Sequence, residues 1–251
     1  MPTERGTTSN TDRIMDLWVN SWIAALVVGT ITWGLIIWCL VAYRRRKGTV
    51  GFPRQTSFNL PLEVFYLTIP IFMVLVFFYF TDRDQQAIDD RSQPADVVVD
   101  VRGKQWAWDF NYKSGDVIKE DLHEAGVQAH LTGNTIDKEQ LPTLYLPVNK
   151  SVDLELNARD VIHSFWVPAF LQKRDMIPGK TNYIRFTPTK EGTYDGKCAE
   201  LCGEYHSEML FRVKVVSESE FQAHMDQLKA DGNTGLLGVE YDRNPNLNET
   251  K

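Results

Sequence analysis

The chain has 251 residues, and its 27 basic and 33 acidic side chains give a formal net charge of −6. A general nucleic-acid binder needs a basic face, so this charge argues against that class. The charge is also unevenly spread: residues 1–80 carry 7 basic and 4 acidic side chains, whereas the remaining residues carry 20 and 29. A basic N-terminal third followed by an acidic remainder excludes a single ordinary globular domain.

Two long apolar segments dominate the N-terminal third. Residues 21–43 form a run of 23 residues without a charge, and residues 62–80 form a run of 19 residues with one acidic side chain, Glu63, near its start. The first run makes about 35 Å of helix, enough to cross the hydrocarbon core of a bilayer. We therefore predict a transmembrane hairpin over residues 21–80, in preference to two buried core helices. Residues 1–20 are expected to form an external tail.

The connecting loop predicts how the hairpin is oriented. The loop, residues 44–60, has no acidic side chain and five basic ones: Arg44, Arg45, Arg46, Lys47 and Arg54. The positive-inside rule places such a loop in the cytoplasm, so both termini are expected on the outer side. Residues 1–14 are polar and lack the apolar core of a secretory signal peptide.

Residues 81–230 are predicted to form an all-β domain. Short runs rich in Val, Ile, Thr and aromatic residues recur over residues 97–101, 106–112, 143–147, 152–156, 161–167, 182–187 and 209–216. Several strands at this spacing indicate a sandwich or a barrel. A capping box at Ser217–Glu220 predicts a closing helix to about Ala230. Residues 113–141 are interpreted as a polar surface insertion, and residues 231–251 as a flexible tail.

The chemically distinctive residues gather in one short segment, KCAELCGEYHSEM, at residues 197–209. It supplies two thiols, an imidazole and a thioether, and a second imidazole lies upstream on a predicted strand: Cys198, Cys202, His206, Met209 and His163. These soft and borderline donors suit copper better than calcium, magnesium or manganese. An upstream histidine followed by a tight Cys–His–Met loop is the layout of cupredoxin-type copper sites. Those sites use one thiolate, whereas two thiolates can bridge two metal ions.

With these motifs the chain resembles subunit II of the haem-copper cytochrome c oxidases over most of its length. The hairpin is followed, in the family's order, by Lys104–Trp108 (KQWAW), Asp160–Trp166 (DVIHSFW), Arg174–Gly179 (RDMIPG) and the Cys-x-Glu-x-Cys-x-x-x-His-x-x-Met loop. The fold class that the resemblance implies is a membrane-anchored α+β protein. Its two-helix transmembrane hairpin precedes an all-β cupredoxin-like Greek-key sandwich, expected at residues 81–230.

The resemblance also implies a binuclear copper centre, CuA. Both copper ions would share the thiolates of Cys198 and Cys202. One ion would be completed by His163 and Met209, and the other by the remaining two ligands, His206 and the backbone carbonyl of Glu200. In this family the centre takes electrons from a c-type cytochrome and passes them to haem in subunit I, where oxygen reduction is coupled to proton pumping. Haems and CuB are expected in subunit I only.

Three further residues receive roles, Trp106 and Glu63 from the same resemblance and Asp160 from the acidic charge of the outer region. Trp106 would be the aromatic side chain through which electrons arrive, and Glu63 would collect protons from the cytoplasm. Asp160 would help to dock the cytochrome. Trp106 and Trp108 are expected to share one face of a strand. The implied partners are subunit I, other oxidase subunits, the cytochrome donor and membrane lipid, in a bacterial- or archaeal-type plasma membrane.

Several alternatives compete with this interpretation. Cys198 and Cys202 face an oxidising compartment and could form a disulfide, but that leaves both histidines and Met209 unexplained. A structural zinc site would not explain Met209. Quinol oxidases share the hairpin and the outer fold, but their second subunit lacks the copper ligands. A membrane-tethered copper chaperone or assembly factor is the alternative from another class, and it would be expected to bind a single copper ion.

Overall fold

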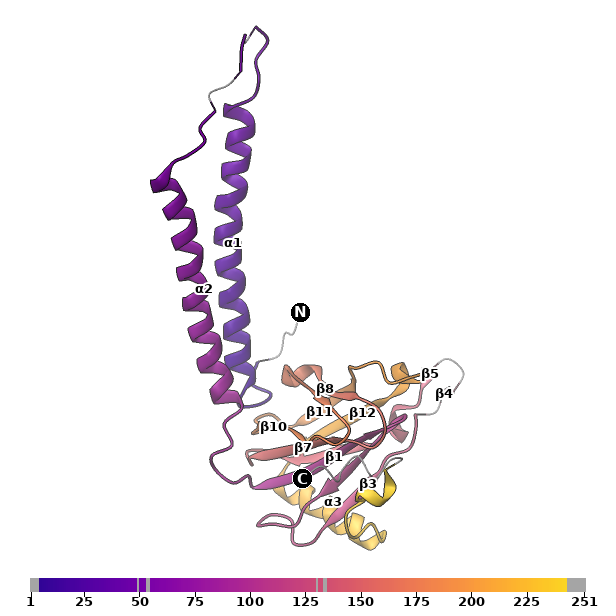
Figure 1. Cartoon of the computed structure of the whole chain (residues 1–251). Coiled ribbons are helices and arrows are strands. Elements are labelled where there is room, and N and C mark those ends of the chain that lie inside the picture. The colour runs from indigo at the N-terminus through magenta and orange to yellow at the C-terminus, as the bar shows by residue number, and fades with distance from the viewer. Residues whose placement is uncertain (1–4, 49, 53–54, 130, 133–134, 243–251) are drawn as a thin grey trace. The chain divides into compact units, whose positions relative to one another are not determined.

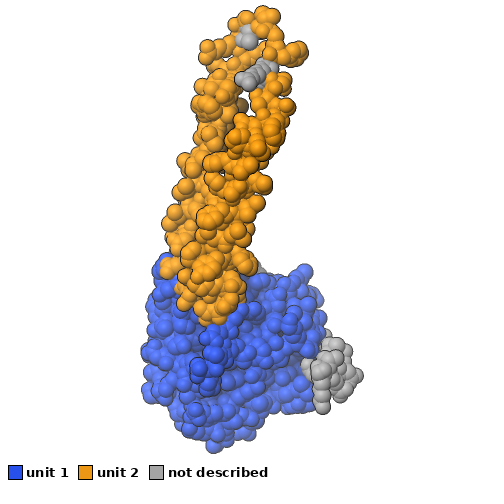
Figure 2. Space-filling model, turned by 60° about the vertical axis from the view of Figure 1, so that its left-hand side comes forward, with its two compact units in different colours: residues 1–12, 88–251 blue, residues 13–87 orange. Residues whose placement is uncertain are grey.

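The computed structural model describes residues 5–48, 50–52, 55–129, 131–132 and 135–242. The chain divides into two compact units, one of residues 13–87 and one that combines residues 1–12 with residues 88–251 (Figure 2). The first is a helical hairpin and the second is a β-sandwich.

The hairpin consists of two long antiparallel helices, α1 (Thr11–Ala42) and α2 (Leu60–Ile88) (Figure 1). Both are long and apolar enough to cross a membrane. Polar residues precede the apolar run in α1 and follow it in α2. Among these polar residues, Asp84 of α2 accepts hydrogen bonds from Arg13 of α1 at 3.0 Å and from Arg83 at 2.9 Å. The two predicted apolar helices are therefore confirmed, and both are longer than their apolar runs.

The second unit packs two five-stranded sheets face to face. One sheet has the order β10-β7-β1-β2-β3, formed by Asn182–Phe186, Val152–Ala158, Val97–Lys104, Ala107–Tyr112 and Leu122–Ala125. The other has the order β6-β12-β11-β8-β9, formed by Thr143–Pro147, Leu210–Val216, Gly192–Cys198, His163–Val167 and Gln172–Met176. The pairs β1–β7 and β6–β12 are parallel. The predicted sandwich is confirmed, and a short separate pair is formed by β4 (Leu131–Thr132) and β5 (Thr135–Ile136).

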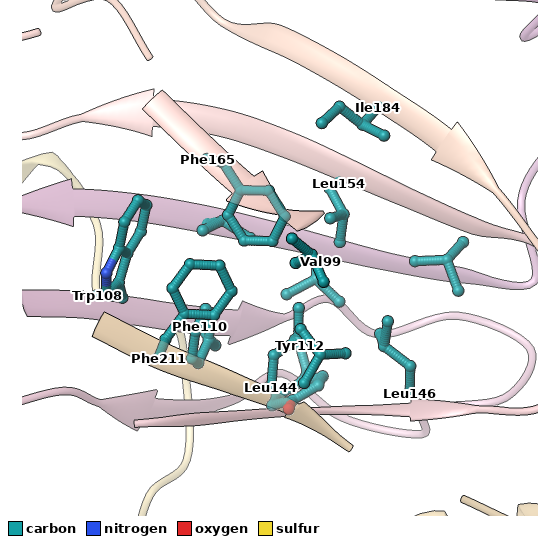
Figure 3. Close-up of a cluster of buried hydrophobic side chains, with 14 of the residues drawn as sticks. Val99, Trp108, Phe110, Tyr112, Leu144, Leu146, Leu154, Phe165, Ile184 and Phe211 are labelled. Atoms are coloured by element: carbon teal, nitrogen blue, oxygen red, sulfur yellow. The ribbon is translucent and has the colours of Figure 1, made fainter. Parts of the chain in front are cut away.

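The core lies between the two sheets and is rich in aromatic rings (Figure 3). Alternating residues of β7 bury Val152, Leu154 and Leu156, as the sequence pattern predicts. Trp108 of β2 and Phe211 of β12 face each other with ring centroids 4.8 Å apart. The Phe211 ring in turn stacks on Phe165 of β8 at 4.7 Å. Such pairs add stability beyond the area that they bury, so this end of the core is rigid.

Two strands of the second sheet are absent from the sequence prediction. β9 is mostly polar, QKRDM, and it lies at a sheet edge, where charged side chains are tolerated. β11 contains two glycines, which usually mark turns. A Cβ atom at Gly196 would lie only 2.2 Å from the Phe211 ring. Glycine therefore stands in this strand because the neighbouring ring occupies the space of a side chain.

Residues 113–141 are only partly the surface insertion that the sequence predicts. They contribute β3, which pairs with β2, and they bury Ile118 and Leu122 in the core. The closing helix is confirmed as α3 (Glu218–Ala230), where the Ser217 hydroxyl accepts a hydrogen bond from the Glu220 N–H at 3.2 Å. Its residues Phe221, Met225 and Leu228 are buried in the same core.

The prediction of a flexible tail is wrong for residues 231–242. The Arg159 guanidinium donates hydrogen bonds to the carbonyl oxygens of Leu237 and Gly238 and to the carboxylate of Asp242. The Leu237 N–H also donates to Asn111 at 2.8 Å. These contacts come from residues distant in sequence, so composition alone did not reveal them. Residues 243–251 lie outside the described part of the chain.

Candidate metal centre

The candidate site lies at one end of the second sheet, in the loop between β11 and β12. The loop is closed at its base, because the Cys198 N–H donates to the Met209 carbonyl at 3.0 Å. Cys198 also pairs with Phe165 across to β8, the strand that begins with His163. From the core, the Trp108 indole N–H donates to the Met209 carbonyl at 3.4 Å. Sheet pairing and the aromatic core thus hold both ends of the loop.

The structure brings together all six donors that the sequence predicts as ligands. The Cys198 sulfur lies 3.9 Å from Nδ1 of His163 and 3.2 Å from the Glu200 carbonyl oxygen. The two cysteine sulfurs are 3.9 Å apart. The Cys202 sulfur lies 3.5 Å from Nδ1 of His206 and 3.7 Å from the Met209 sulfur. The donors therefore form one continuous series, in which the two sulfurs are central.

The two cysteines are not joined as a disulfide in this structure. A disulfide bond requires two sulfurs about 2.05 Å apart, whereas these lie 3.9 Å apart and both cysteines are free. The ligand atoms of His163, Cys198 and Cys202 all lie within 4.8 Å of one another, and all three residues are buried. Buried thiols facing an imidazole and a thioether fit a soft or borderline metal such as copper.

His163 is fixed by a carboxylate behind it. Its Nε2 donates to Asp160 at 2.8 Å, which leaves Nδ1 facing the Cys198 thiol. Burial lowers the pKa of His163, but the hydrogen bond to Asp160 and the Cys198 thiol outweigh it and raise the pKa above its ordinary value. A Cβ atom at Gly103 would lie only 3.0 Å from the His163 ring, so a glycine at this position leaves room for the imidazole.

The two thiols differ in acidity. Burial raises the pKa of Cys198, but contacts with His163 and with the backbone of Glu200 and Ser164 outweigh it and lower the pKa to about 7. Burial raises the pKa of Cys202 to about 12, and the adjacent charge of Cys198 adds to the rise. A metal that binds both as thiolates must therefore displace protons, and its affinity is expected to fall as the pH is lowered.

Trp106 and Trp108 do not share a face as predicted. Trp108 is completely buried in the core, whereas Trp106 precedes β2 in the turn and is only partly buried. The Trp106 ring packs edge-on against Tyr205 with centroids 4.9 Å apart, and its indole N–H donates to the Cys202 carbonyl at 3.2 Å. Trp106 thus contacts both the exposed Tyr205 ring and the backbone of the sulfur loop.

The structure places Asp160 within the site rather than on an exposed docking surface. Its side chain is 6% exposed. One oxygen accepts hydrogen bonds from His163 and from the Val161 N–H, and the other accepts from the Gln105 N–H at 2.8 Å. Burial raises the pKa of Asp160, but these hydrogen bonds outweigh it and lower the pKa. The difference from the prediction arises because His163, three residues along, draws the carboxylate inward.

Glu63 lies in the hairpin, at the start of α2. Its carboxylate accepts a hydrogen bond from the Asn59 N–H at 3.1 Å, and the Asn59 side chain accepts from the Leu62 N–H at 3.3 Å. These reciprocal bonds satisfy backbone N–H groups at the helix N-terminus, where negative charge is favourable. Glu63 therefore has a structural role in addition to any role in proton uptake.

Sequence reasoning missed a residue that contacts the sulfur loop, Gln105, and the role of a residue within that loop, Gly203. The Gln105 side-chain amide donates to the Cys202 carbonyl at 2.8 Å. Gly203, with φ of 120°, allows that approach, because a Cβ atom there would lie 3.1 Å from the Trp106 ring. The only signal in the sequence was the place of Gln105 beside Trp106, since these contacts span almost 100 residues.

Comparisons with known proteins agree with this arrangement. Residues 97–216 match the family described as cytochrome c oxidase subunit II, periplasmic domain. The chain is 44% identical to a probable cytochrome c oxidase subunit 2 of Streptomyces avermitilis, with 94% of this chain and 81% of that protein covered. It is 33% identical to cytochrome c oxidase subunit 2 of Mycobacterium tuberculosis, covering 92% and 76%. The periplasmic domain of subunit II of cytochrome oxidase from Bradyrhizobium japonicum, a solved structure, is 31% identical, with a TM-score of 0.46, and covers 55% of this chain and 97% of that chain.

Two helices that are long and apolar enough to cross a membrane precede a β-sandwich domain that carries the sulfur loop. The chain belongs to the cytochrome c oxidase subunit II family. It is therefore a subunit of a haem-copper terminal oxidase, which is an oxidoreductase.

Proposed function

We propose that this subunit receives electrons for the oxidase through a binuclear copper centre, CuA. It would accept them from a c-type cytochrome and deliver them toward haem in subunit I, where oxygen is reduced and protons are pumped. The observation that carries this proposal is the continuous series of five soft or borderline donors and one backbone carbonyl around Cys198 and Cys202.

The resemblance to the family implies how the six ligands would be divided. Both cysteine thiolates would bridge the ions, since their sulfurs lie 3.9 Å apart at the centre of the series. His163 and Met209 would complete one ion, and His206 with the Glu200 carbonyl the other. When bound, the copper pair supplies one-electron transfer. The protein contributes a rigid pocket that excludes water, because His163, both cysteines and Met209 are buried.

The number of copper ions tests the proposal against the copper-chaperone alternative. The full chain, purified in detergent and loaded with copper, should contain two ions per chain, with a purple absorption spectrum and a seven-line EPR pattern. One weakly held copper per chain with an ordinary mononuclear spectrum would instead favour the chaperone.

The surface over the site supports docking of a basic cytochrome at the outer face of a bacterial plasma membrane. Leu201 is 78% exposed, and Ile162 and Tyr205 are also exposed. The exposed acidic residues Glu200 and Glu204 lie in the same loop as Leu201 and Tyr205. Exposed apolar residues with acidic neighbours in the sequence suit a basic partner, and such association weakens as salt screens the charges.

Replacing Trp106 by alanine is expected to slow electron transfer from the cytochrome by at least about tenfold, a barrier increase of ~1.4 kcal/mol. The reason is the loss of the ring that joins the surface at Tyr205 to the Cys202 carbonyl. Stopped-flow reduction of the assembled oxidase measures the rate. Binding of the cytochrome should change little, and Trp106→Phe should retain more of the rate than Trp106→Ala. A parental rate in Trp106→Ala would place electron uptake elsewhere.

Replacing Glu63 by alanine is expected to slow haem reduction and turnover while the copper spectrum stays intact. The proposal is that Glu63 collects protons from the cytoplasm for subunit I, since ionisable groups in membrane spans often mark proton paths. Glu63→Gln is the matched control, because its amide oxygen can still accept the Asn59 N–H bond. Slow turnover in both variants supports proton uptake, whereas a defect in Glu63→Ala alone leaves only the helix-capping role.

A further inference from the structure

The turn between β1 and β2 contacts both halves of the donor series. Gln105, in this turn, uses two different groups. Its backbone N–H donates to Asp160 at 2.8 Å, and Asp160 in turn fixes His163. Its side-chain amide donates to the Cys202 carbonyl at 2.8 Å. One residue therefore holds an upstream histidine and a downstream cysteine that lie on separate segments of the chain.

The Cys202 carbonyl accepts a second hydrogen bond, from the Trp106 indole at 3.2 Å. A carbonyl oxygen has two lone pairs, so two N–H donors saturate it. Cys202 is 3% exposed and its sulfur contacts three other donors. Holding this carbonyl in place therefore holds the backbone of Cys202, which carries the side chain with the sulfur.

Close packing shows that the turn and the loop are fitted to each other. A Cβ atom at Gly203 would lie 3.2 Å from the Gln105 amide nitrogen, and a Cβ atom at Gly103 would lie 3.0 Å from the His163 ring. Both distances are tighter than ordinary van der Waals contact. The absence of side chains at these two positions lets the turn reach both ligands.

We propose that Gln105 is a positioning residue for the copper centre, one that sets the distance between His163 and Cys202 through Asp160 and the Cys202 carbonyl. This inference rests on the proposed function, because it concerns the same donors. Residues that orient metal ligands through hydrogen bonds typically change metal affinity by roughly 10- to 100-fold when they are replaced. The amide also withdraws electron density from the peptide of a bridging cysteine.

The test replaces Gln105 by methionine, which keeps the length of the side chain but removes the amide donor. The backbone N–H to Asp160 remains, so the change isolates the bond to Cys202. Gln227→Met, at an exposed position of α3, is the matched control. All forms are studied as full chains in detergent, and circular dichroism checks that each is folded.

We expect Gln105→Met to lower copper affinity by roughly 10- to 100-fold and to change the copper hyperfine splitting and the midpoint potential, while Gln227→Met matches the parent. In the metal-free chain, alkylation of Cys202 followed by mass spectrometry should be several-fold faster in Gln105→Met than in the parent. Trp106→Phe, which removes the other donor to the same carbonyl, should change these quantities in the same direction.

The inference would be overturned if Gln105→Met matched the parent in copper affinity, hyperfine splitting, midpoint potential and rate of Cys202 alkylation. This holds even if the parent shows a binuclear signal. A parent without that signal would instead overturn the proposed function. In that case the alkylation rates of the metal-free chains still decide whether Gln105 holds Cys202. If Gln105→Met does not fold, Trp106→Phe supplies the same comparison.

Discussion

Replacing Cys202 by serine should lower the copper content from two ions per chain to at most one and abolish the seven-line EPR pattern. The Cys202 sulfur contacts the sulfur of Cys198, the His206 ring and the Met209 thioether at 3.5–3.9 Å. The Cys198 sulfur likewise contacts three donors, so the two sulfurs are the centre of the series. A serine hydroxyl is a hard donor and stays protonated at neutral pH, so it cannot bridge soft metal ions as a thiolate does.

Glu200→Gln provides the contrast. Glu200 is assigned through its backbone carbonyl, which lies 3.2 Å from the Cys198 sulfur, while the residue itself is exposed. This variant should therefore keep both coppers and the binuclear spectrum. Copper analysis and EPR of the two variants, prepared in parallel as full chains, make the comparison. Two spectroscopically coupled coppers in Cys202→Ser would exclude the bridging assignment.

The proposed copper ligands could be identified as candidates because most of them lie within one short segment. Twelve consecutive residues, 198–209, contain five of the six, and their spacing is itself a pattern. The surroundings of the ligands could not be predicted in the same way. Gln105 and Asp160 act through contacts between segments that lie 55 and 97 residues apart. Asp160 looked like a surface charge because sequence shows the type of a side chain but not its burial.

The fold was predictable where hydrophobic pattern and burial agree. The apolar runs of α1 and α2 and the alternation in β7 both follow directly from the sequence. β11 was missed because glycine usually indicates a turn, whereas Gly196 is a glycine because the Phe211 ring on the neighbouring strand leaves no room for a side chain. β9 was missed because edge strands tolerate charge. In each case the deciding contact is tertiary, and local propensity points the other way.

The ordered C-terminal segment, residues 233–242, depends on a buried cation. Arg159 and Asp109 are each only 3% exposed and joined at 2.8 Å, and Arg159 also binds Asp242 at 2.8 Å. Two further guanidinium hydrogen bonds reach the carbonyls of Leu237 and Gly238. A buried arginine between two carboxylates is costly to remove, because its loss leaves Asp109 to its pair with Lys104 and Asp242 to its pair with Arg102.

Arg159→Met should therefore destabilise the outer domain by about 3 kcal/mol, which lowers its melting temperature by roughly 6–12 °C for a domain of this size. Thermal unfolding of the metal-free full chain, followed by tryptophan fluorescence, measures the change. Arg174→Met is the matched control, since Arg174 pairs with Asp89 at the surface and exposed pairs contribute less than about 1 kcal/mol. Equal melting temperatures for the two variants would show that the buried cation is not what stabilises the domain.

A double variant separates lost charge pairing from lost packing. Adding Asp242→Asn to Arg159→Met removes the charge of one of the two carboxylates that Arg159 joins, so it should restore part of the stability. The effects of the two changes on stability should therefore be non-additive. Hydrogen exchange adds a local measurement, because the Leu237 N–H bonds to Asn111 only while the segment is in place. Faster exchange at Leu237 in Arg159→Met, at a temperature where β1 and β7 remain protected, would show that the C-terminal segment detaches before the sandwich unfolds.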